Sequence, residues 1–331
     1  KTYGLAGGIA AYIRGGTSIT DCVNAATVIA GDTRGYSPSA GGIVGCSERE
    51  QQNQITDCIN TGTVKVIVPK GDYSSAGGIL GQAINCTLIS NCSNFGPISG
   101  GRLENATSKK SYVGGIVGHI VSTTVSDCYN TGTVTDTANP EPTLGGIVGI
   151  LDGTTSLVNS YNVGSVTATS TTATLGGVAG SVSRYNNTIT NCYYLTDTAG
   201  QACGKNDGVI TNTTDKSAFD FANGGVLALL MAGRPADAQP WDTTCKYLES
   251  AGMTLPVLAK QNLTVHDHVW STYTTDTAAK THTHSCACGV VETEACTITP
   301  ATCKDGSACA VCGQQYGGPD TGKHADLQHF P

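Results

Sequence analysis

The chain has 331 residues, of which 13% are charged, and its formal net charge at pH 7 is −7. The charge is spread without a cluster of Lys or Arg, which disfavours binding to nucleic acid or to an anionic membrane. No apolar stretch approaches the roughly 18 residues of a membrane span, so we expect no direct membrane insertion. The chain begins inside a repeat, and we interpret it as a fragment of a longer, exported, multidomain protein.

Residues 1 to about 200 contain six copies of a diglycine followed by a short apolar run. The copies recur at intervals of 31 to 37 residues. A period of this size indicates stacked repeats that bury each other's apolar faces. The diglycines are Gly7-Gly8, Gly41-Gly42, Gly77-Gly78, Gly114-Gly115, Gly145-Gly146 and Gly176-Gly177.

Each diglycine is followed by a polar motif built around Cys and Asn, as in residues 57–60 with the sequence DCIN. The apolar run, the stretch that ends at this Cys and the Thr-Val pair after the next turn predict three short strands per repeat. Three strands per coil describe a right-handed parallel β-helix of triangular section, an all-β solenoid over residues 1–200. Such a repeated architecture favours a scaffold over an enzyme.

Stacking is expected to place equivalent side chains above one another. The Cys column, interrupted by Ser160, suits packing in a narrow core better than a metal or redox column. The Asn column can satisfy backbone groups of the turns, and the Asp that opens the motif, replaced by Asn in three copies, is typical of a turn rather than of a catalytic or Ca²⁺ site. The columns are Cys22, Cys58, Cys92, Cys128 and Cys192; Asn24, Asn60, Asn94, Asn130 and Asn162; and Asp21, Asp57 and Asp127.

The linked motifs, for example GGIVG at 41–45 with DCINTGTV at 57–64, resemble the GLUG-motif repeats of bacterial surface proteins. The resemblance covers residues 1 to about 200. It implies a β-helix at the surface of, or secreted by, Gram-positive or gut bacteria. The family includes adhesin-like proteins and some immunoglobulin-A-cleaving metallopeptidases. The peptidase activity is not implied, because the sequence contains no His-Glu-x-x-His motif.

Residues 201–262 break the repeat and are expected to form a helical cap with a closing strand. Asn223 is placed as the N-cap of an apolar helix that runs to Met231, and Gly233 and Pro235 are stop signals. We expect this helix to cover the open end of the last coil, because unpaired strand edges invite association. Trp241 and residues 255–258 resemble the closing strand that follows such a helix in similar surface proteins.

Four further cysteines leave two pairings open. Cys46 and Cys86 follow successive diglycines and are candidates for a disulfide between coils. Cys203 and Cys245 are candidates for a disulfide that fixes the cap, and the alternative for them is a pair of buried thiols.

Residues 263–331 form a cysteine-rich module, and the last 70 residues hold six of the 15 cysteines and six of the seven histidines. Two Cys-rich knuckles, each followed by Gly, predict a structural tetrahedral Zn²⁺ site, whereas three disulfides are the competing interpretation for an exported protein. Either staple would replace an apolar core that this module lacks. A catalytic zinc is disfavoured because four protein ligands leave no position for water. The predicted ligands are Cys286, Cys288, Cys309 and Cys312, with Cys303 or His284 as a substitute for one of them.

Residues 301–317 resemble small cysteine-rich repeats found, often in tandem, in surface proteins of gut Firmicutes, and residues 323–329 resemble the start of a further unit. This resemblance implies a modular extracellular protein and brings no known chemistry.

Even repeats, low charge and the absence of a catalytic motif favour a non-catalytic, adhesin-like module that binds a host glycan or surface protein. A polysaccharide-cleaving β-helix enzyme and a purely structural stalk are the alternatives, and the first rests on fold alone. A lyase would need an Arg or Lys base beside acidic groups. The Arg residues of the repeats are scattered without such groups: Arg14, Arg34, Arg49, Arg102 and Arg184.

Tyrosines of the corner loops are the candidate ligand contacts, because Tyr stacks on sugars and protein surfaces with little loss of entropy. Tyr129 and Tyr161 share a repeat position, so packing within a ladder is an equal interpretation for them. The candidate ligand-binding residues are Tyr36, Tyr73, Tyr112 and Tyr185.

Overall fold

The structure is a computed structural model, and it describes residues 4–31, 37–48, 52–68, 73–85, 87–102, 110–235, 239–248, 251–261, 271–285, 291–302 and 305–320. The chain divides into two units, Lys1–Ala251 with Leu255–Thr264 and Gly252–Thr254 with Val265–Pro331. The first contains a parallel β-solenoid and the second, which we call the C-terminal unit, contains two small antiparallel sheets. No described helix is both long and apolar enough to cross a membrane.

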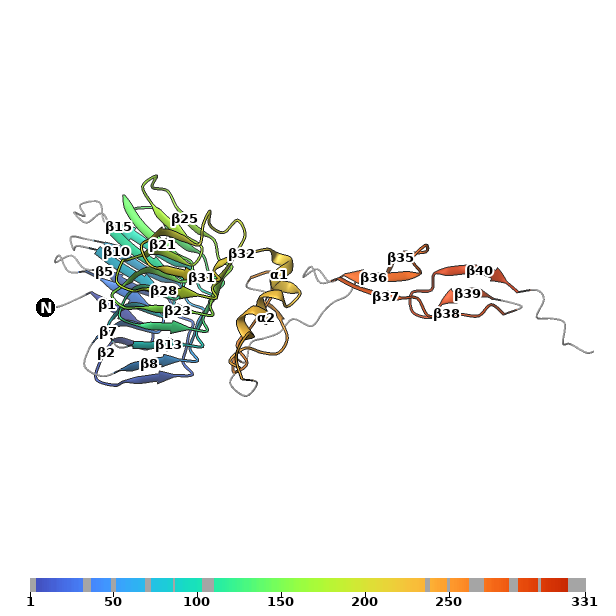
Figure 1. Ribbon diagram of the computed structural model, residues 1–331, viewed down its shortest axis with the longest axis horizontal. Helices are drawn as coiled ribbons and strands as arrows, with labels where there is room; N and C mark the ends of the chain where they lie inside the picture. The colour runs from blue at the N-terminus through green and yellow to red at the C-terminus, as the bar shows by residue number, and fades with distance from the viewer. Residues whose placement is uncertain are drawn as a thin grey trace, which may run out of the picture. The chain divides into compact units, whose positions relative to one another are not determined.

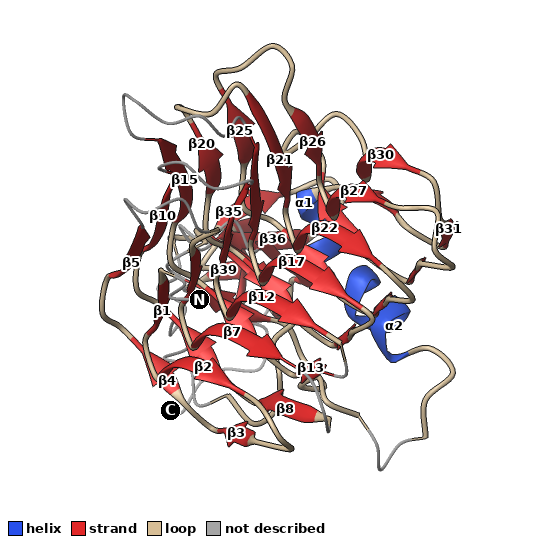
Figure 2. Cartoon of the chain, turned by 90° about the vertical axis from the view of Figure 1, so that its left-hand side faces the viewer, coloured by secondary structure: helices blue, strands red, loops and turns tan. Residues whose placement is uncertain are grey.

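The predicted all-β parallel solenoid is confirmed, but each complete coil contains five short strands and not three (Figure 2). Successive coils stack these strands into five parallel sheets, which we call A to E in the order in which the chain meets them. The described strands form five complete coils and two partial ones, and the last solenoid strand ends at Lys216.

In each of the five sheets, every strand pairs with the equivalent strand of the neighbouring repeat. Sheet A contains β1 (Leu5–Gly7), β6 (Ser39–Gly41), β11 (Tyr73–Gly77), β16 (Lys110–Gly114), β21 (Glu141–Gly145) and β26 (Thr174–Gly176). Sheet B contains β2 (Ala10–Ile13), β7 (Val44–Glu48), β12 (Leu80–Ile84), β17 (Val117–Val121), β22 (Val148–Asp152), β27 (Ala179–Val182) and β30 (Cys203–Asn206). Sheet C contains β3 (Ser18–Thr20), β8 (Asn53–Thr56), β13 (Thr87–Ser90), β18 (Thr124–Ser126), β23 (Ser156–Val158), β28 (Thr188–Thr190) and β31 (Val209–Thr211).

Sheets D and E complete the coil. Sheet D contains β4 (Val23–Asn24), β9 (Ile59–Asn60), β14 (Ser93–Asn94), β19 (Tyr129–Asn130), β24 (Tyr161–Asn162), β29 (Tyr193–Leu195) and β32 (Thr214–Lys216). Sheet E contains β5 (Val28–Gly31), β10 (Val64–Val68), β15 (Ile98–Arg102), β20 (Val134–Asp136) and β25 (Val166–Ala168).

The extra strands arise because the diglycine is a corner between sheets A and B. In the second coil one strand ends at Gly41 and the next begins at Val44, so the GGIVG run contributes to two sheets. A Cβ on Gly41 would lie 1.8 Å from the carbonyl oxygen of Val44. The backbone therefore approaches itself too closely at this corner for any side chain.

The diglycine corner and the Asn column meet inside the coil, which explains why the two motifs occur together. A Cβ on Gly42 would lie 2.4 Å from Cγ of Asn60. The Asn60 amide donates to Asn94 Oδ1 at 2.7 Å and to the carbonyl of Gly62 at 2.8 Å. The wall formed by these groups separates two apolar clusters, one lined by sheets B and C and the other by sheets A and E. The predicted structural role of the Asn column is confirmed.

The Asp or Asn that opens the polar motif forms the turn between sheets C and D. These residues adopt the left-handed conformation, which Asn and Asp tolerate better than other side chains because they bond the local backbone. The turn role predicted for this position is therefore confirmed. The φ angles are 54° for Asp21, 55° for Asp57, 54° for Asn91, 54° for Asp127, 48° for Asn159 and 52° for Asn191.

The described residues within 217–248 and 255–261 form a segment that we call the strap. It contains α1 (Ala218–Ala222) and α2 (Gly225–Met231), and β33 (Lys246–Leu248) pairs with β34 (Met253–Leu255). The expectation of one helix capped by Asn223 is wrong, because Asn223 is the C-cap of α1. Gly224, at φ 83°, is the N-cap of α2, and this left-handed glycine separates the two helices.

The strap lies along the side of the solenoid and does not cover its open end as expected (Figure 1). Lys260 contacts Asp57 in the second coil, and Arg234 contacts Asp127 in the fourth. The strap therefore crosses several strands of sheet D. Its expected closing strand is reduced to a single antiparallel bridge between Trp241 and Leu258.

The described strands of the C-terminal unit, between residues 271 and 320, form two three-stranded antiparallel sheets. The first contains β35 (Thr274–Asp276), β36 (Thr281–Ser285) and β37 (Val291–Ala295). The second contains β38 (Ile298–Thr299), β39 (Gly306–Cys309) and β40 (Gln315–Pro319). Few of its described side chains are buried, and His282 and Cys309 are the buried ones among its His and Cys residues that the structure describes.

Candidate functional site

Tyr129 and Tyr161 of sheet D are fully buried and form a packing ladder under the strap. Their rings stack at 5.1 Å and 13°, and Trp241 of the strap lies 6.1 and 5.7 Å from them. The Tyr129 hydroxyl donates to Oε1 of Gln261 at 2.8 Å. The ladder interpretation of these two tyrosines is therefore confirmed, and they are not ligand contacts.

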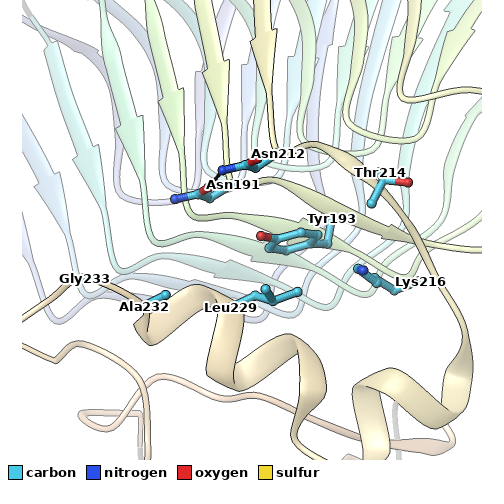
Figure 3. Close-up of a pocket in the computed structure, with 8 residues that line it drawn as sticks. All are labelled: Asn191, Tyr193, Asn212, Thr214, Lys216, Leu229, Ala232 and Gly233. Carbon is cyan, nitrogen blue, oxygen red and sulfur yellow. Dashed lines mark hydrogen bonds between the residues drawn. The ribbon is translucent and has the colours of Figure 1, made fainter.

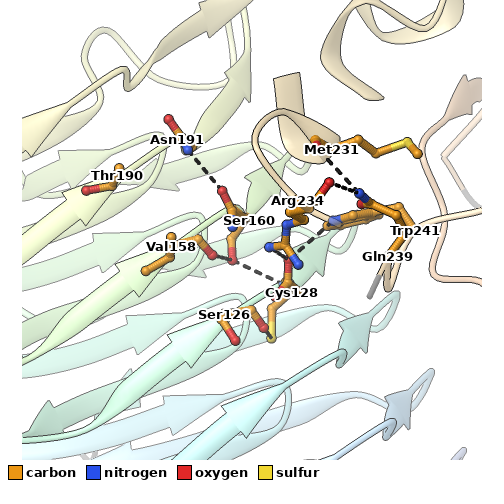
Figure 4. Close-up of polar contacts among 12 residues, drawn as sticks. Ser126, Cys128, Val158, Ser160, Thr190, Asn191, Met231, Arg234, Gln239 and Trp241 are labelled. Atoms are coloured by element: carbon orange, nitrogen blue, oxygen red, sulfur yellow. Dashed lines mark hydrogen bonds and ion pairs between the residues drawn. The ribbon is translucent and has the colours of Figure 1, made fainter. Parts of the chain in front are cut away.

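Polar contacts fix the strap to the turns of sheet D (Figure 4). Arg234 and the indole N–H of Trp241 both donate to Oδ1 of Asp127, the latter at 3.3 Å. The Gln239 amide donates to the carbonyl of Arg234 at 3.3 Å and so holds the loop that carries this residue. Burial raises the pKa of Asp127, and the Arg234 guanidinium opposes that rise.

A pocket of about 550 Å³ lies where α2 leans over the last strands of sheet D (Figure 3). We call it the strap pocket. Its solenoid side offers amides, two hydroxyls and an ammonium group, and its strap side is apolar. The lining residues are Asn191, Tyr193, Asn212, Thr214, Lys216, Leu229, Ala232 and Gly233.

The polar wall of the strap pocket is a short ladder of amides at the turns. The Asn212 amide donates to Oδ1 of Asn191 at 3.2 Å, and Asn191 donates to Asn159 in turn at 3.1 Å. The Lys216 ammonium lies 5.8 Å from the centre of the Tyr193 ring, a cation–π distance. Asn212 and Thr214 are exposed and can exchange hydrogen bonds with a ligand.

A second, smaller pocket of about 260 Å³ lies on the outer faces of sheets A and B, and we call it the Tyr112 pocket. Tyr112 lines it together with Lys110, Glu141 and hydroxyl side chains. The Tyr112 ring packs 5.2 Å from Tyr73, so the structure brings two of the predicted ligand residues together. Tyr36 lies outside the described residues, and Tyr185, 59% exposed, lines neither pocket.

The His119 ring packs edge-on against the Tyr73 and Tyr112 rings, at centroid distances of 5.4 and 5.3 Å. Burial lowers the pKa of His119 from 6.5 to about 4, and Asp152 opposes this shift. The buried Nε2 of His119 has no hydrogen-bond partner, whereas Nδ1 lies 3.3 Å from the Gln82 amide. The His119 imidazole therefore packs against both tyrosine rings from the middle of β17.

The Cys column packs in the core as predicted. The Cys92 thiol donates to the carbonyl of Ser90 at 3.2 Å, and the same contact recurs for Cys58 and Cys128. Burial raises the pKa of Cys192 to about 12, so its reactive thiolate does not form at neutral pH. Ser160 keeps the pattern by donating to the Val158 carbonyl at 2.9 Å.

The proposed disulfides in the first 262 residues are not formed where the structure describes both partners. Cys203 and Cys245 are free thiols, which agrees with the buried-thiol alternative for Cys203. Cys46 is also a free, buried thiol, and Cys86 lies outside the described residues.

A cluster of one histidine and three cysteines joins the two sheets of the C-terminal unit. It consists of His282 in β36, Cys296 just after β37, Cys309 at the end of β39 and Cys312 in the turn that follows. Their potential ligand atoms all lie within 4.8 Å of one another. His282 is 1% exposed, so the cluster is shielded from water on that side.

The surroundings of the cluster orient its members. Nε2 of His282 lies 3.3 Å from Oε2 of Glu294, which leaves Nδ1 turned toward the sulfurs. The Tyr316 hydroxyl donates to Cys296 Sγ at 3.1 Å. Backbone N–H groups of Cys312 and Val311 lower the pKa of the Cys309 thiol to about 6.

The structure places two of the four predicted zinc ligands, Cys309 and Cys312, in this cluster. Cys286, Cys288 and Cys303 lie outside the described residues. His284 stacks on Tyr273 at 4.8 Å and is not a member of the cluster. Sequence reasoning missed His282 and Cys296, because neither belongs to a Cys-x-x-Cys or Cys-x-Cys spacing.

Residues 110–136 form one complete coil, with the corner at Gly114-Gly115 and a ladder amide at Asn130. Residues 111–135 match the family model of the GLUG motif. This match confirms the predicted resemblance for that coil. The neighbouring coils pair with it in register, Asn130 opposite Asn94 on one side and Asn162 on the other.

A Bacteroides ovatus protein of known structure, proposed to be an immunoglobulin A1 protease, is similar to this chain with 20% sequence identity and a TM-score of 0.49. The similarity covers 77% of this chain and 75% of the other. No curated protein matches the sequence. These comparisons do not test the predicted resemblance of residues 301–317 to cysteine-rich repeats of Firmicutes, or the predicted origin in Gram-positive or gut bacteria. Both stay predictions.

Proposed function

We propose that the chain is a non-catalytic β-helix module of a secreted or cell-surface protein, and that it binds a glycan in the strap pocket. The observation that carries the proposal is the size and lining of this pocket. Its volume of about 550 Å³ falls within the range of roughly 300 to 1,000 Å³ of small-ligand sites, whereas the Tyr112 pocket, at about 260 Å³, falls below it.

The lining of the strap pocket suits a sugar. Amide groups of Asn191 and Asn212 and the Thr214 hydroxyl can both donate and accept, as sugar hydroxyls require. Leu229, 38% exposed on α2, offers an apolar surface for the C–H face of a ring. The repeated coils hold these groups in fixed positions, so little entropy is lost when a ligand binds.

The lining supports binding rather than cleavage. Glycoside hydrolysis requires two carboxyl groups flanking the scissile bond. Among the described residues that line the strap pocket, none is Asp, Glu or His. Lys216 is the one cationic side chain of this lining, and it lies near the Tyr193 ring without a lining carboxylate that could hold Ca²⁺ for a lyase.

The extracellular setting and the role of the C-terminal unit belong to the same proposal. The GLUG-motif match supports a bacterial surface or secreted protein. We propose that the C-terminal unit is a spacer within a larger chain, and that its cluster binds a structural zinc ion instead of forming disulfides. The free state of Cys296, Cys309 and Cys312 supports zinc.

Titration of the purified chain with soluble oligosaccharides tests the pocket. Asn212→Gly keeps the left-handed turn but removes the amide, and Thr214→Val removes the hydroxyl with little change in shape. Each should weaken binding by about 5- to 10-fold, the effect of one lost hydrogen bond. Ile29→Ala, at a 55% exposed site in β5 of the first coil, is the control and should leave affinity unchanged. If the two pocket variants bind as tightly as the wild type and the control, the strap pocket is not the site.

A further inference from the structure

We infer that one zinc ion binds between the two sheets of the C-terminal unit, coordinated by Nδ1 of His282 and the sulfurs of Cys296, Cys309 and Cys312. This replaces the two knuckles predicted from sequence by one knuckle, a histidine from β36 and a cysteine after β37. The inference rests on the proposed zinc-stapled spacer and is independent of the strap pocket.

The distances fit a tetrahedral zinc site. With Zn–S near 2.3 Å and Zn–N near 2.05 Å, nitrogen and sulfur ligands lie about 3.5 Å apart and two sulfurs about 3.8 Å apart. Nδ1 of His282 lies 3.5 Å from Cys296 Sγ and 3.7 Å from Cys309 Sγ. All four ligand atoms lie within 4.8 Å of one another, so the four side chains converge on a space that one ion can share.

The histidine is held as zinc-ligating histidines are. Such residues usually donate their second ring N–H to a carboxylate, which fixes the tautomer and the orientation of the ring. In this unit Glu294 is placed for that role, 3.3 Å from Nε2 of His282. Tyr273 packs edge-on against the same ring at 4.7 Å and restricts its rotation. Glu294 is a positioning residue, since it contacts the histidine and not the ion.

Disulfides explain the cluster less well. Cys296, Cys309 and Cys312 are all free thiols whose sulfurs converge on one histidine nitrogen. A disulfide would also leave Nδ1 of a buried histidine facing sulfur atoms that no longer donate a proton or carry charge. Three thiolates and one imidazole leave no open position, so the site is structural and the ion replaces a missing apolar core.

The experiment measures bound metal in the full chain purified from medium supplemented with zinc, by native mass spectrometry and elemental analysis. We expect one zinc per chain, with a tetrahedral cobalt spectrum after exchange. His282→Gln and Cys296→Ser should each lower zinc affinity by more than 100-fold. The matched control His284→Gln, two residues away in the same strand, should retain it. Glu294→Gln should lower affinity by about 10- to 100-fold, and Glu294→Asp should recover part of the loss.

Several outcomes would overturn the assignment. Less than about one zinc in ten chains, another bound metal, or a mass that shows disulfides among the three cysteines would each refute a zinc site of this composition. Loss of zinc in Cys286→Ser or Cys288→Ser but not in His282→Gln and Cys296→Ser would return the site to the ligands expected from sequence. Oligosaccharide binding measured on the same samples tests the strap pocket separately, so failure of one proposal is not mistaken for failure of the other.

Discussion

Arg234 and Asp127, 107 residues apart in sequence, form an ion pair that joins the strap to the turn between sheets C and D in the fourth coil. The Asp127 carboxylate also accepts the Trp241 indole N–H. Asn occupies the equivalent turn position in three other coils, as in Asn159. The acidic residue at this turn therefore serves the strap, and the turn itself does not require it.

Arg234→Met should release the strap and destabilise the first unit by about 2 to 3 kcal/mol. This is less than the ~3 to 5 kcal/mol of a fully buried pair, because a fifth of the Arg234 side chain is exposed. Asp127→Asn in the same chain should recover most of the loss, because it removes the buried charge. Urea denaturation gives the free energies, and Trp241 fluorescence in a Trp270→Phe background reports the release. An equal loss in the single and double variants would show that the charge is not the cause.

The Arg234→Met loss should also depend on pH. Burial already raises the pKa of Asp127, and removal of the guanidinium raises it further. A carboxyl group whose folded pKa is raised destabilises the fold above that pKa, and the penalty disappears as pH falls through it. The difference between wild type and variant should therefore shrink as pH is lowered from neutral into the acidic range in which the carboxyl group takes up a proton. A difference that grows on acidification would contradict the assignment.

Gly115→Ala should unfold the solenoid or cost more than about 4 kcal/mol. The added Cβ would lie 2.1 Å from the Gly146 carbonyl oxygen and 2.3 Å from Cγ of Asn130, and neither group can move without breaking a ladder. Gly200→Ala, which meets nothing within 4 Å, is the matched control and should be neutral. Circular dichroism melts compare the two. A stable Gly115→Ala variant would contradict the packing of the corner against the amide ladder.

Asn94→Ala should destabilise the solenoid by about 3 kcal/mol. It removes a hydrogen bond from Asn60 and another to Asn130, and buried amides left without partners cost about 1 to 3 kcal/mol each. Asn24→Ala is the comparison, because Asn24 lies at the end of the ladder and bonds one other ladder amide, Asn60. Its loss should be about half as large. Equal losses at the two positions would argue against a continuous ladder.

Acidification should weaken the fold through His119. Its folded pKa of about 4 is below the ordinary 6.5, so the unfolded chain binds more protons between these values and stability falls as pH falls through this window. The loss at pH 5 relative to pH 7 is expected to be about 2 kcal/mol. His119→Phe, which keeps a ring under Tyr73 and Tyr112, should lack this part of the pH dependence. Urea midpoints at both pH values measure it.

Periodicity in the sequence was sufficient to predict the solenoid, the ladders and the turns, because each depends on residues that recur at one place in every repeat. It did not reveal that the chain bends at Gly41-Gly42, since an apolar run after a diglycine has the same pattern on a strand and around a corner. The five-strand coil follows from contacts between repeats, which spacing alone does not describe.

The strap and the metal cluster depend on contacts between segments far apart in sequence. The sequence alone allows Tyr129 and Tyr161 to be exposed ligand contacts. The strap covers them, with Trp241 packed against both rings and Phe221 against Tyr161. His282 and Cys296 likewise become neighbours through the pairing of β36 with β37. Sequence motifs identified Cys309 and Cys312 because those two ligands share one local turn.

Incubating the full chain with host glycans, mucins and plant polysaccharides, and scoring retention and new chain ends in the same wells, tests whether the chain binds glycans without cleaving them. We predict retention on at least one glycan, weakened by Asn212→Gly, with no new chain ends. New chain ends would contradict the non-catalytic assignment, and no retention on any surface would contradict glycan binding and favour a structural stalk.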